Sequence, residues 1–324
     1  MSATIQLSFR PDFLRFRFPF RIAHGERLGT DVVFVSAASG DCIGYGEAAL
    51  PPYLPFSQAS TMQWLERVLA ETSFSIDDAP EEIARALAKR YPGEWPALCA
   101  LDTALWQLQA AHQKLSLSAL LDIPAKHVPH TFTIGLGTQQ EVEKKVAFGF
   151  SRGYTLFKLK LDGKHDREMV QWFRACTDAP FAVDANQAWT SVNEAIYSAH
   201  MLRDAGAILI EQPFHRDDLE SMTKLTAERI LPVIADESCQ TEEDIARLHG
   251  TCDGVNIKLQ KCGGLSFAMK MLDEARSRDM KVLVGCMSES ATGIAPAEVL
   301  ASEADWADLD GPDLIVESPN PVMG

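Results

Sequence analysis

The second half of the chain repeats one unit, a short apolar strand followed by an amphipathic helix, at intervals of roughly 25 residues. Strand alternating with helix predicts a parallel sheet. The expected strands cover residues 132–137, 156–162, 181–186, 207–213, 232–238, 254–259, 281–287 and 307–312. Eight such strands predict an α/β fold, a closed (β/α)8 barrel over residues 128–312. An open doubly wound sheet is the alternative, but no GxGxxG motif follows the first strand to favour it.

Residues 1–127 follow a different pattern. Apolar side chains at every second position from Leu14 to Ile22 predict a strand, with arginines on the opposite face. Residues 31–39 and 43–50 predict two further strands around a turn at Gly40 and Asp41. Helical patterns follow, the strongest over residues 95–113. We therefore expect an N-terminal α+β domain with an antiparallel sheet.

The overall charge and the cysteines limit the class of protein. A formal net charge of −15 argues against a nucleic-acid-binding surface and against binding to anionic membranes. No apolar run is long enough to cross a bilayer, and the first residues lack the apolar centre of a signal peptide. Seven scattered cysteines without CxxC spacing indicate reduced thiols, and the histidines do not cluster with them as in a zinc site. We expect a cytoplasmic protein that acts on a small molecule, alone or as a homo-oligomer.

Polar residues recur where the predicted strands end. In a barrel these ends meet at one opening, where active sites lie. Polar residues also mark simple strand exits into solvent, but a run over seven consecutive strands favours a site. The residues are Lys158, Lys160, Asp184, Asn186, Glu211, Asp236, Glu237, Lys258, Ser288, Glu289, Asp308 and Asp310.

Three of these residues, Asp184, Glu211 and Asp236, come from adjacent strands. Carboxylates that point at one place repel each other unless a cation lies between them. Oxygen ligands without histidine or cysteine suit Mg²⁺, with Mn²⁺ as the second candidate.

Two lysines flank this predicted metal site. Lys160 on the second barrel strand and Lys258 on the sixth would face each other from opposite walls, so one could remove a proton from a carbon and the other could return one to its opposite face. Lys158 shares the face of Lys160 and would help to lower its pKa. The alternatives are salt bridges from these lysines to Asp184 or Asp236, and Lys261 in place of Lys258.

The motifs KLK (158–160), VDANQAW (183–189), IEQP (210–213), ADES (235–238) and NIKLQKCGG (256–264) together resemble the muconate lactonizing subgroup of the enolase superfamily. This resemblance covers nearly the whole chain. It implies a modified TIM barrel, an N-terminal capping domain, and a C-terminal segment, residues 313–324, that returns to the capping domain. Enzymes of this superfamily use a lysine or histidine base with Mg²⁺ to stabilise an enediolate. The resemblance gives Asn186 and Glu237 supporting roles beside the metal and the lysines.

Within the subgroup, VGCMSES (284–290) and DLDGP (308–312) are similar to the dipeptide epimerases. The resemblance implies that Asp308 and Asp310 hold the substrate ammonium group, with Ser288 and Glu289 nearby. It suggests dipeptides such as L-Ala-D/L-Glu from peptidoglycan turnover. The alternatives are N-acylamino acid racemisation, succinylbenzoate synthesis, cycloisomerisation or a non-catalytic barrel.

The resemblance also implies that two capping-domain loops, which match residues 23–31 and 48–57, select the substrate side chain. They offer His24 and Tyr53 as substrate contacts. Glu26 and Arg27 are alternatives in the first loop, where an arginine would favour an acidic side chain.

Overall fold

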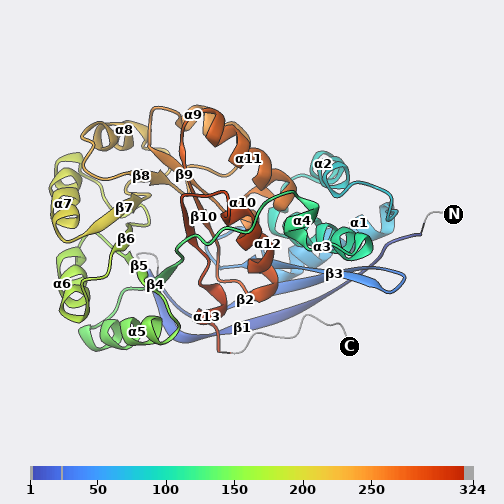
Figure 1. The fold of residues 1–324 in the computed structure, drawn as a ribbon, viewed down its shortest axis with the longest axis horizontal. Coiled ribbons are helices and arrows are strands. Elements are labelled where there is room, and N and C mark those ends of the chain that lie inside the picture. Colours follow the sequence, from blue (N-terminus) through green and yellow to red (C-terminus); the bar gives the residue numbers. More distant parts are fainter. Residues whose placement is uncertain (1–2, 23–24, 317–324) are drawn as a thin grey trace.

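The computed structural model describes residues 3–22 and 25–316, which form two parts lying side by side (Figure 1). The larger part is a parallel sheet whose strands follow one another in chain order. Its strands are β4 (Thr131–Ile134), β5 (Leu156–Lys160), β6 (Phe181–Asp184), β7 (Ala207–Glu211), β8 (Val233–Ala235), β9 (Gly254–Ile257), β10 (Lys281–Gly285) and β11 (Trp306–Asp308).

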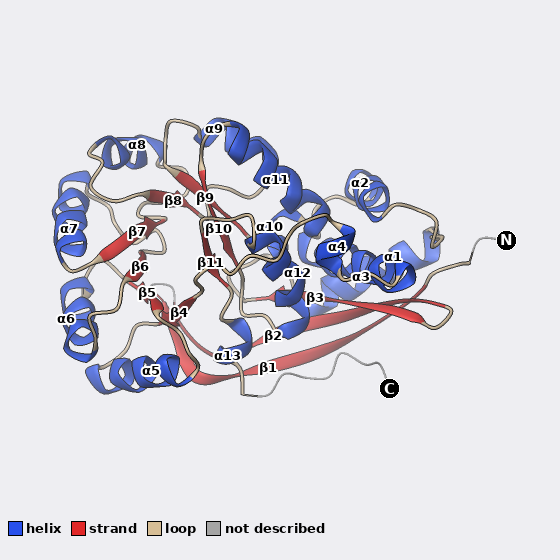
Figure 2. Cartoon of the chain, in the orientation of Figure 1, coloured by secondary structure: helices blue, strands red, loops and turns tan. Residues whose placement is uncertain are grey.

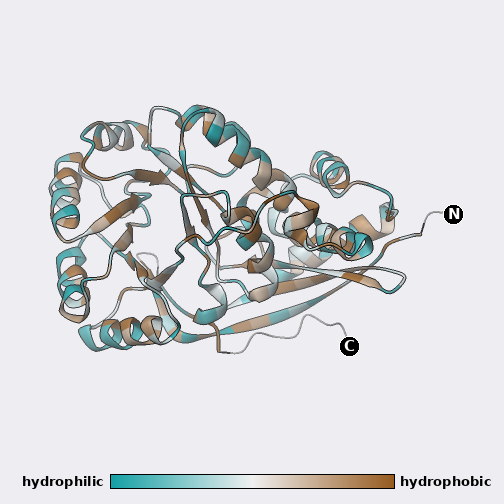
Figure 3. Cartoon of the chain, in the orientation of Figure 1, coloured by the Kyte–Doolittle hydropathy of each residue, from teal (hydrophilic) through white to brown (hydrophobic). Residues whose placement is uncertain are grey.

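Helices cover the outside of this sheet (Figure 2). The strands are brown and the outward faces of the helices teal in Figure 3, as expected for strands buried on both faces. The covering helices are α5 (Gln139–Ser151), α6 (Asp166–Cys176), α7 (Val192–Asp204), α8 (Leu219–Ala227), α9 (Glu242–Leu248), α11 (Leu265–Ser277) and α12 (Ala291–Ala301). Two short helices, α10 (Leu259–Cys262) and α13 (Gly311–Leu314), follow the ends of β9 and β11.

The two edges of the parallel sheet meet and close it into a barrel. A bridge joins His130 to Ala307, and the Thr131 hydroxyl donates to Asp308 Oδ1 at 2.5 Å across the same junction. The prediction of an eight-stranded (β/α) barrel is therefore confirmed for the described residues. The strands end two to four residues earlier than predicted, several of them at the polar residue itself, as with Lys160, Asp184 and Glu211.

The smaller part is the predicted antiparallel sheet with its helices. Strands β1 (Gln6–Ile22), β2 (Gly25–Ser39) and β3 (Cys42–Leu50) pair in that order. Helices α1 (Gln58–Glu71), α2 (Pro80–Arg90), α3 (Trp95–Gln113) and α4 (Leu117–Leu120) follow. Helix α3 spans the residues predicted for it and packs on β3, where Gly44 and Gly46 leave room for its backbone.

The described end of the chain runs back to this antiparallel sheet. Ile315 is buried in a cluster with Leu14, Val32 and Phe34, and it forms an antiparallel bridge with Phe16. Residues 317–324 lie outside the described residues, and the boundaries at 127/128 and 312/313 stay a prediction. Among the described residues, no helix combines the length and apolarity needed to cross a membrane.

Candidate active site

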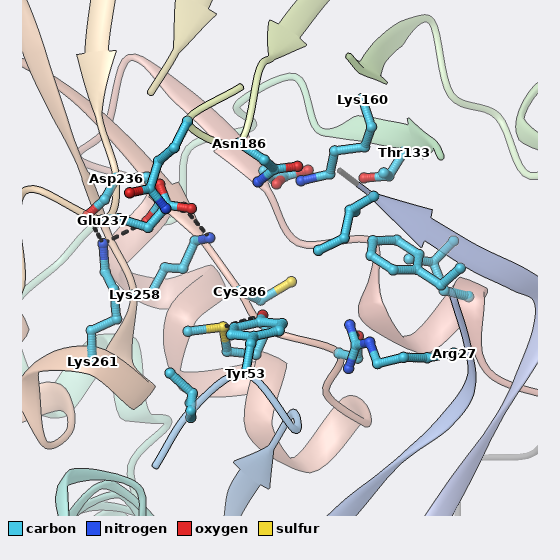
Figure 4. Close-up of a pocket in the computed structure, with 18 of the residues that line it drawn as sticks. Arg27, Tyr53, Thr133, Lys160, Asn186, Asp236, Glu237, Lys258, Lys261 and Cys286 are labelled. Atoms are coloured by element: carbon cyan, nitrogen blue, oxygen red, sulfur yellow. Dashed lines mark hydrogen bonds and ion pairs between the residues drawn. The ribbon is translucent and has the colours of Figure 1, made fainter. Parts of the chain in front are cut away.

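A cavity of about 320 Å³ opens at the carboxyl ends of the barrel strands (Figure 4). This size is at the lower end of the range for small-molecule sites. Residues of the barrel part form most of its lining, and the antiparallel part contributes Phe20, Ile22, Arg27, Tyr53 and Leu54. The two parts of the chain therefore enclose the site together.

The three predicted metal ligands lie together at the base of this site. Asp184 ends β6, Glu211 ends β7 and Asp236 follows β8, so adjacent parallel strands deliver them to one place. Their carboxylate oxygens lie within 4.8 Å of one another, and all three side chains are buried. Such a set of oxygen ligands could hold a divalent cation and suits Mg²⁺.

The carboxyl groups of the metal site and its neighbour Glu237 differ in their pKa values. Burial raises the pKa of Glu211 to about 7, with a further rise from Asp184. Burial likewise raises the pKa of Glu237 to about 8, with a further rise from Asp236. Burial opposes the charge of Asp236 too, but Lys258 and Lys261 hold its pKa well below the usual range. Additional positive charge at this place would let the whole group ionise.

Lys158 lies at the centre of the acidic group, with only 1% of its surface exposed. Its Nζ is 2.7 Å from Glu211 Oε2, 2.7 Å from Asp308 Oδ2 and 3.3 Å from Asp184 Oδ2. Burial alone would lower the pKa of Lys158, but these carboxylates outweigh it and raise the pKa well above its ordinary value. Lys158 is buried beside Lys160, as predicted, and its influence on the pKa of Lys160 stays a prediction.

Lys160 and Lys258 both line the cavity, and they come from opposite walls. Strands β5 and β9 are separated by three strands in each direction around the barrel, and Figure 4 shows the two side chains entering from opposite sides. Lys160 Nζ is 2.5 Å from Asp184 Oδ2, and Lys258 Nζ is 2.7 Å from Asp236 Oδ2. The salt bridges considered as an alternative are thus present, and they place both amines at the edge of the carboxylate group.

Lys261 also reaches Asp236, but its amine is more fully occupied. Its Nζ donates to Asp236 Oδ1 at 2.6 Å, to the Asp236 carbonyl at 2.7 Å and to the Asn256 carbonyl at 2.9 Å. Lys258 Nζ has a single hydrogen bond, to Asp236, within the described residues. Lys258 is therefore the better placed of the two to exchange a proton with a molecule in the cavity.

Asp308 and Asp310 line the same cavity and are both buried. Burial opposes the charge of Asp308, but Lys158 and Lys160 lower its pKa to about 2. Asp310 accepts a hydrogen bond from the Thr133 backbone N–H at 2.6 Å. Burial, together with the charge of Asp308, raises the pKa of Asp310 to about 7. A cation beside Asp310 would therefore be stabilised strongly.

The remaining strand-end residues divide into two sets. Asn186, Glu237 and Ser288 line the cavity, and Asn186 Oδ1 and Glu237 Oε2 are buried without a hydrogen-bond partner among the described residues. Glu289 does not line the cavity: it accepts from Gln260 Nε2 at 3.0 Å and from the Met287 N–H at 2.7 Å. This places Glu289 in support of the β10 loop.

In the first capping loop, Arg27 faces the cavity, and Glu26 is largely exposed and pairs with Arg21. The Arg27 guanidinium lies 5.4 Å from the ring centres of Phe16, Phe20 and Tyr53. Tyr53, which is half exposed, donates from its hydroxyl to Met287 Sδ at 3.3 Å. His24 lies outside the described residues.

Sequence reasoning missed Thr133 and Asn256. Thr133 on β4 lines the cavity and holds Asp310, and Asn256 on β9 donates to Glu211 Oε1 at 2.8 Å. Both lie inside apolar strand patterns, and strand alternation could have placed them on the inner face. Their partners lie on other strands, so the sequence alone does not indicate these contacts.

Comparison with known proteins identifies the family of both parts. Residues 4–122 match the family described as mandelate racemase/muconate lactonizing enzyme, N-terminal domain, and residues 141–307 match the family described as enolase C-terminal domain-like. The L-Ala-D/L-Glu epimerase of Bacteroides thetaiotaomicron is 36% identical over 96% of this chain and 81% of its own length. The L-Ala-D/L-amino acid epimerase of Flavobacterium johnsoniae is 32% identical over 97% of this chain and 92% of its own.

A solved structure has the same architecture. The dipeptide epimerase of Enterococcus faecalis V583, complexed with Mg and the dipeptide L-Leu-L-Tyr, superimposes with a TM-score of 0.89. The match covers 98% of this chain and 93% of that one, at 28% identity.

Proposed function

The chain belongs to the enolase superfamily, in its mandelate racemase and muconate lactonizing enzyme branch, and on that premise we propose that it is a Mg²⁺-dependent dipeptide epimerase. The observation that carries the proposal is one site with three elements. Two lysines line its cavity from opposite walls, a buried cluster of three carboxylates reaches the cavity through Asp236, and an Asp-x-Asp pair lies at the seam of the barrel.

Asp184, Glu211 and Asp236 would hold the Mg²⁺. The fit rests on their clustered oxygens, on the raised pKa of Glu211, and on the unpartnered oxygens of Asn186 and Glu237 nearby. When bound, Mg²⁺ would offset the negative charge that develops on the substrate carboxylate as the neighbouring carbon loses its proton.

Lys160 and Lys258 would carry out the proton transfer. One amine, in its neutral form, takes the proton from the α-carbon of the C-terminal residue, and the ammonium group on the opposite wall gives a proton to the other face. The C–H bond breaks as an N–H bond forms on the first amine, and an N–H bond of the second lysine breaks as the new C–H bond forms, so the carbon is inverted. The arrangement on opposite walls supports this two-sided exchange.

Asp308 and Asp310 would bind the N-terminal ammonium of the dipeptide. The reacting carbon belongs to the C-terminal residue, since its carboxylate is the group that Mg²⁺ can stabilise. The ammonium would then lie one residue away, where Asp308 and Asp310, which are buried and line the cavity, could reach it. A hydrogen bond between charged groups contributes about 1.5–3 kcal/mol, which is roughly ten- to a hundredfold in specificity.

Arg27 supports an acidic side chain on the C-terminal residue, as in L-Ala-D/L-Glu. It lines the cavity, and its Nη1 has no hydrogen-bond partner among the described residues. A guanidinium held by aromatic rings is well suited to bind a carboxylate in two-point fashion. Glu26 pairs with Arg21 instead and does not oppose such a substrate.

A dipeptide library in D₂O with Mg²⁺ tests the proposal. Mass spectrometry should find deuterium at the α-carbon of the C-terminal residue, fastest when that residue is glutamate. N-acetylated partners of the best substrates should have kcat/KM lower by roughly ten- to a hundredfold, and Asp310→Asn should narrow that gap. Equal values for free and acetylated forms would favour N-acylamino acid racemisation. No deuterium in any dipeptide would contradict epimerase activity.

A further inference from the structure

Gln212, which follows β7, has an unusual backbone conformation and no solvent exposure. Its φ is +35°, in the left-handed region that residues other than glycine rarely adopt. Asn186 and Gln187, after β6, have φ of +43° and +67°. Such conformations persist where the surrounding contacts enforce them, and they concentrate at functional sites.

The side-chain amide of Gln212 uses all four of its hydrogen-bonding positions. Its Oε1 accepts from the Asp236 N–H at 2.8 Å and from the Ser238 N–H at 3.1 Å. Its Nε2 donates to the Phe214 carbonyl at 3.0 Å and to Ser238 Oγ at 2.9 Å. Three of these partners are backbone groups that can only donate or only accept, so they fix the orientation of the amide.

The backbone of Gln212 joins two neighbouring strand ends. Its N–H donates to the Ile234 carbonyl on β8, and its carbonyl accepts from the Gln187 N–H after β6, both at 2.9 Å. Gln212 therefore connects the ends of β6, β7 and β8. These are the three strands that carry Asp184, Glu211 and Asp236.

We infer that Gln212 is a positioning residue for the metal site: it holds the three metal-binding carboxylates in the geometry that binds Mg²⁺. This inference rests on the proposed function, since it takes Asp184, Glu211 and Asp236 as ligands. The observation that supports it most directly is the hydrogen bond from the Asp236 N–H to Gln212 Oε1, which fixes the position of the backbone that carries the Asp236 carboxylate. Loss of such outer partners weakens metal binding by roughly 10- to 100-fold.

A second buried glutamine provides a matched control. Gln260 is 2% exposed, and its amide donates to the Glu47 carbonyl at 2.8 Å and to Glu289 Oε2 at 3.0 Å. It also accepts from the Ala49 N–H at 3.1 Å. These contacts join the barrel to the antiparallel sheet, so Gln260→Met removes a comparable set of hydrogen bonds without touching the three carboxylates.

The experiment titrates metal-free, folded full-length protein with MgCl₂ alone by calorimetry. Gln212→Met should weaken Mg²⁺ binding by roughly 10- to 100-fold, whereas Gln260→Met should leave the Kd at the wild-type value. Gln212→Glu keeps an oxygen for the Asp236 and Ser238 N–H groups, so its Kd should lie closer to the wild type. If Gln212→Met does not fold, Gln212→Asn, whose shorter amide falls short of Asp236, should show the same loss.

The outcomes separate the inference from the function on which it rests. A folded Gln212→Met protein, or Gln212→Asn in its place, that binds Mg²⁺ as tightly as the wild type overturns the positioning role and leaves the epimerase proposal intact. Equal weakening by Gln260→Met also overturns it, because a general loss of stability then explains both. A wild-type protein that does not bind Mg²⁺ overturns the inference and the metal site together.

Discussion

At the scale of single residues, the site depends on how buried charges balance one another. Lys158 contacts three carboxylates and is almost completely buried. Lys160 and Lys258 each contact one carboxylate and reach the cavity. A lysine surrounded by acids has its amine fully occupied, whereas a lysine at the edge of the acids is accessible to a substrate. This difference in surroundings leads us to assign proton transfer to Lys160 and Lys258.

Replacing either of these two lysines tests that assignment. Lys160→Ala and Lys258→Ala should each lower the rate of epimerisation by roughly 10²–10⁴-fold, because a positioned acid or base is lost. Each variant should still exchange the α-proton of one isomer with D₂O, and the two variants should exchange opposite isomers. Proton NMR of each isomer in D₂O measures this. Normal turnover in Lys258→Ala together with lost exchange in Lys261→Ala would move the role to Lys261.

A buried lysine outside the site predicts a pH effect on stability. Lys145 on α5 is 5% exposed and donates to the Gly135 carbonyl at 3.2 Å. Burial lowers its pKa from 10.5 to about 8. The folded protein therefore binds fewer protons than the unfolded chain between pH 8 and 10.5, and the contribution of Lys145 to the free energy of unfolding rises with pH across that range.

Lys145→Met removes this titration. Below pH 8 the variant should be more stable than the wild type by an amount on the order of 3 kcal/mol, and the difference should shrink as the pH approaches 10.5. Urea unfolding of both proteins at several pH values measures this difference in the free energy of unfolding. Subtracting one from the other cancels the titration of the cysteines and tyrosines that both proteins share. A difference that stays constant with pH would contradict the lowered pKa.

At the scale of elements, the close contact of α3 with β3 depends on two glycines. A Cβ at Gly44 would lie 2.1 Å from the Ala104 carbonyl oxygen, and a Cβ at Gly46 would lie 1.9 Å from that of Ala100. Backbone atoms cannot move aside as a flexible side chain can. The helix can therefore lie against the strand only because these two positions carry no side chain.

Gly46→Ala should consequently push α3 away from the sheet. We expect a loss of roughly 1–3 kcal/mol or more in the free energy of unfolding, in the range for overpacked contacts. Ile43→Ala, at a 42% exposed position of the same strand, is the control and should cost less. Thermal unfolding of both variants compares them, and equal losses would argue against the steric account.

Some features of these elements could be predicted from the sequence, and others could not. The extent of α3 follows from hydrophobic periodicity, and the parallel barrel follows from the alternation of strands with helices along the chain. The three carboxylates of the metal site could be predicted because the carboxyl ends of parallel strands meet at one side of the barrel. Three other features join residues that are distant along the chain: the aromatic rings around Arg27, the hydrogen bond from Thr133 to Asp310, and the contacts of Gln212. Periodicity carries no information about such pairs.

At the scale of the whole molecule, buried acids and buried lysines form one connected group at the centre of the barrel. The chain carries a formal net charge of −15, so a divalent cation enters a protein that already has excess negative charge. A ligand that binds only the folded protein stabilises it by mass action. We therefore expect Mg²⁺ to raise stability as well as to support catalysis.

Mg²⁺ at about 100 times its Kd should add about 2.7 kcal/mol to the free energy of unfolding and raise the Tm. A chelator should reverse both effects and abolish activity. Asp236→Asn should lose the Mg²⁺-dependent part of the increase. NaCl at the same ionic strength is the control for screening of the net charge. Full activity in chelator-treated protein would rule out the metal site.

The seam of the barrel, where Thr131 meets Asp308, has a consequence for the order in which the site comes into being. The residues proposed for the chemistry lie between positions 158 and 258, whereas those proposed to recognise the substrate lie on the flanks, at Arg27, Asp308 and Asp310. During synthesis, the residues proposed for the chemistry leave the ribosome before the last strand, which closes the barrel around them. Over evolutionary time, a change at Arg27 would alter which substrates the cavity accepts, whereas a change at Asp308 would also reach the buried Lys158 beside the reactive centre.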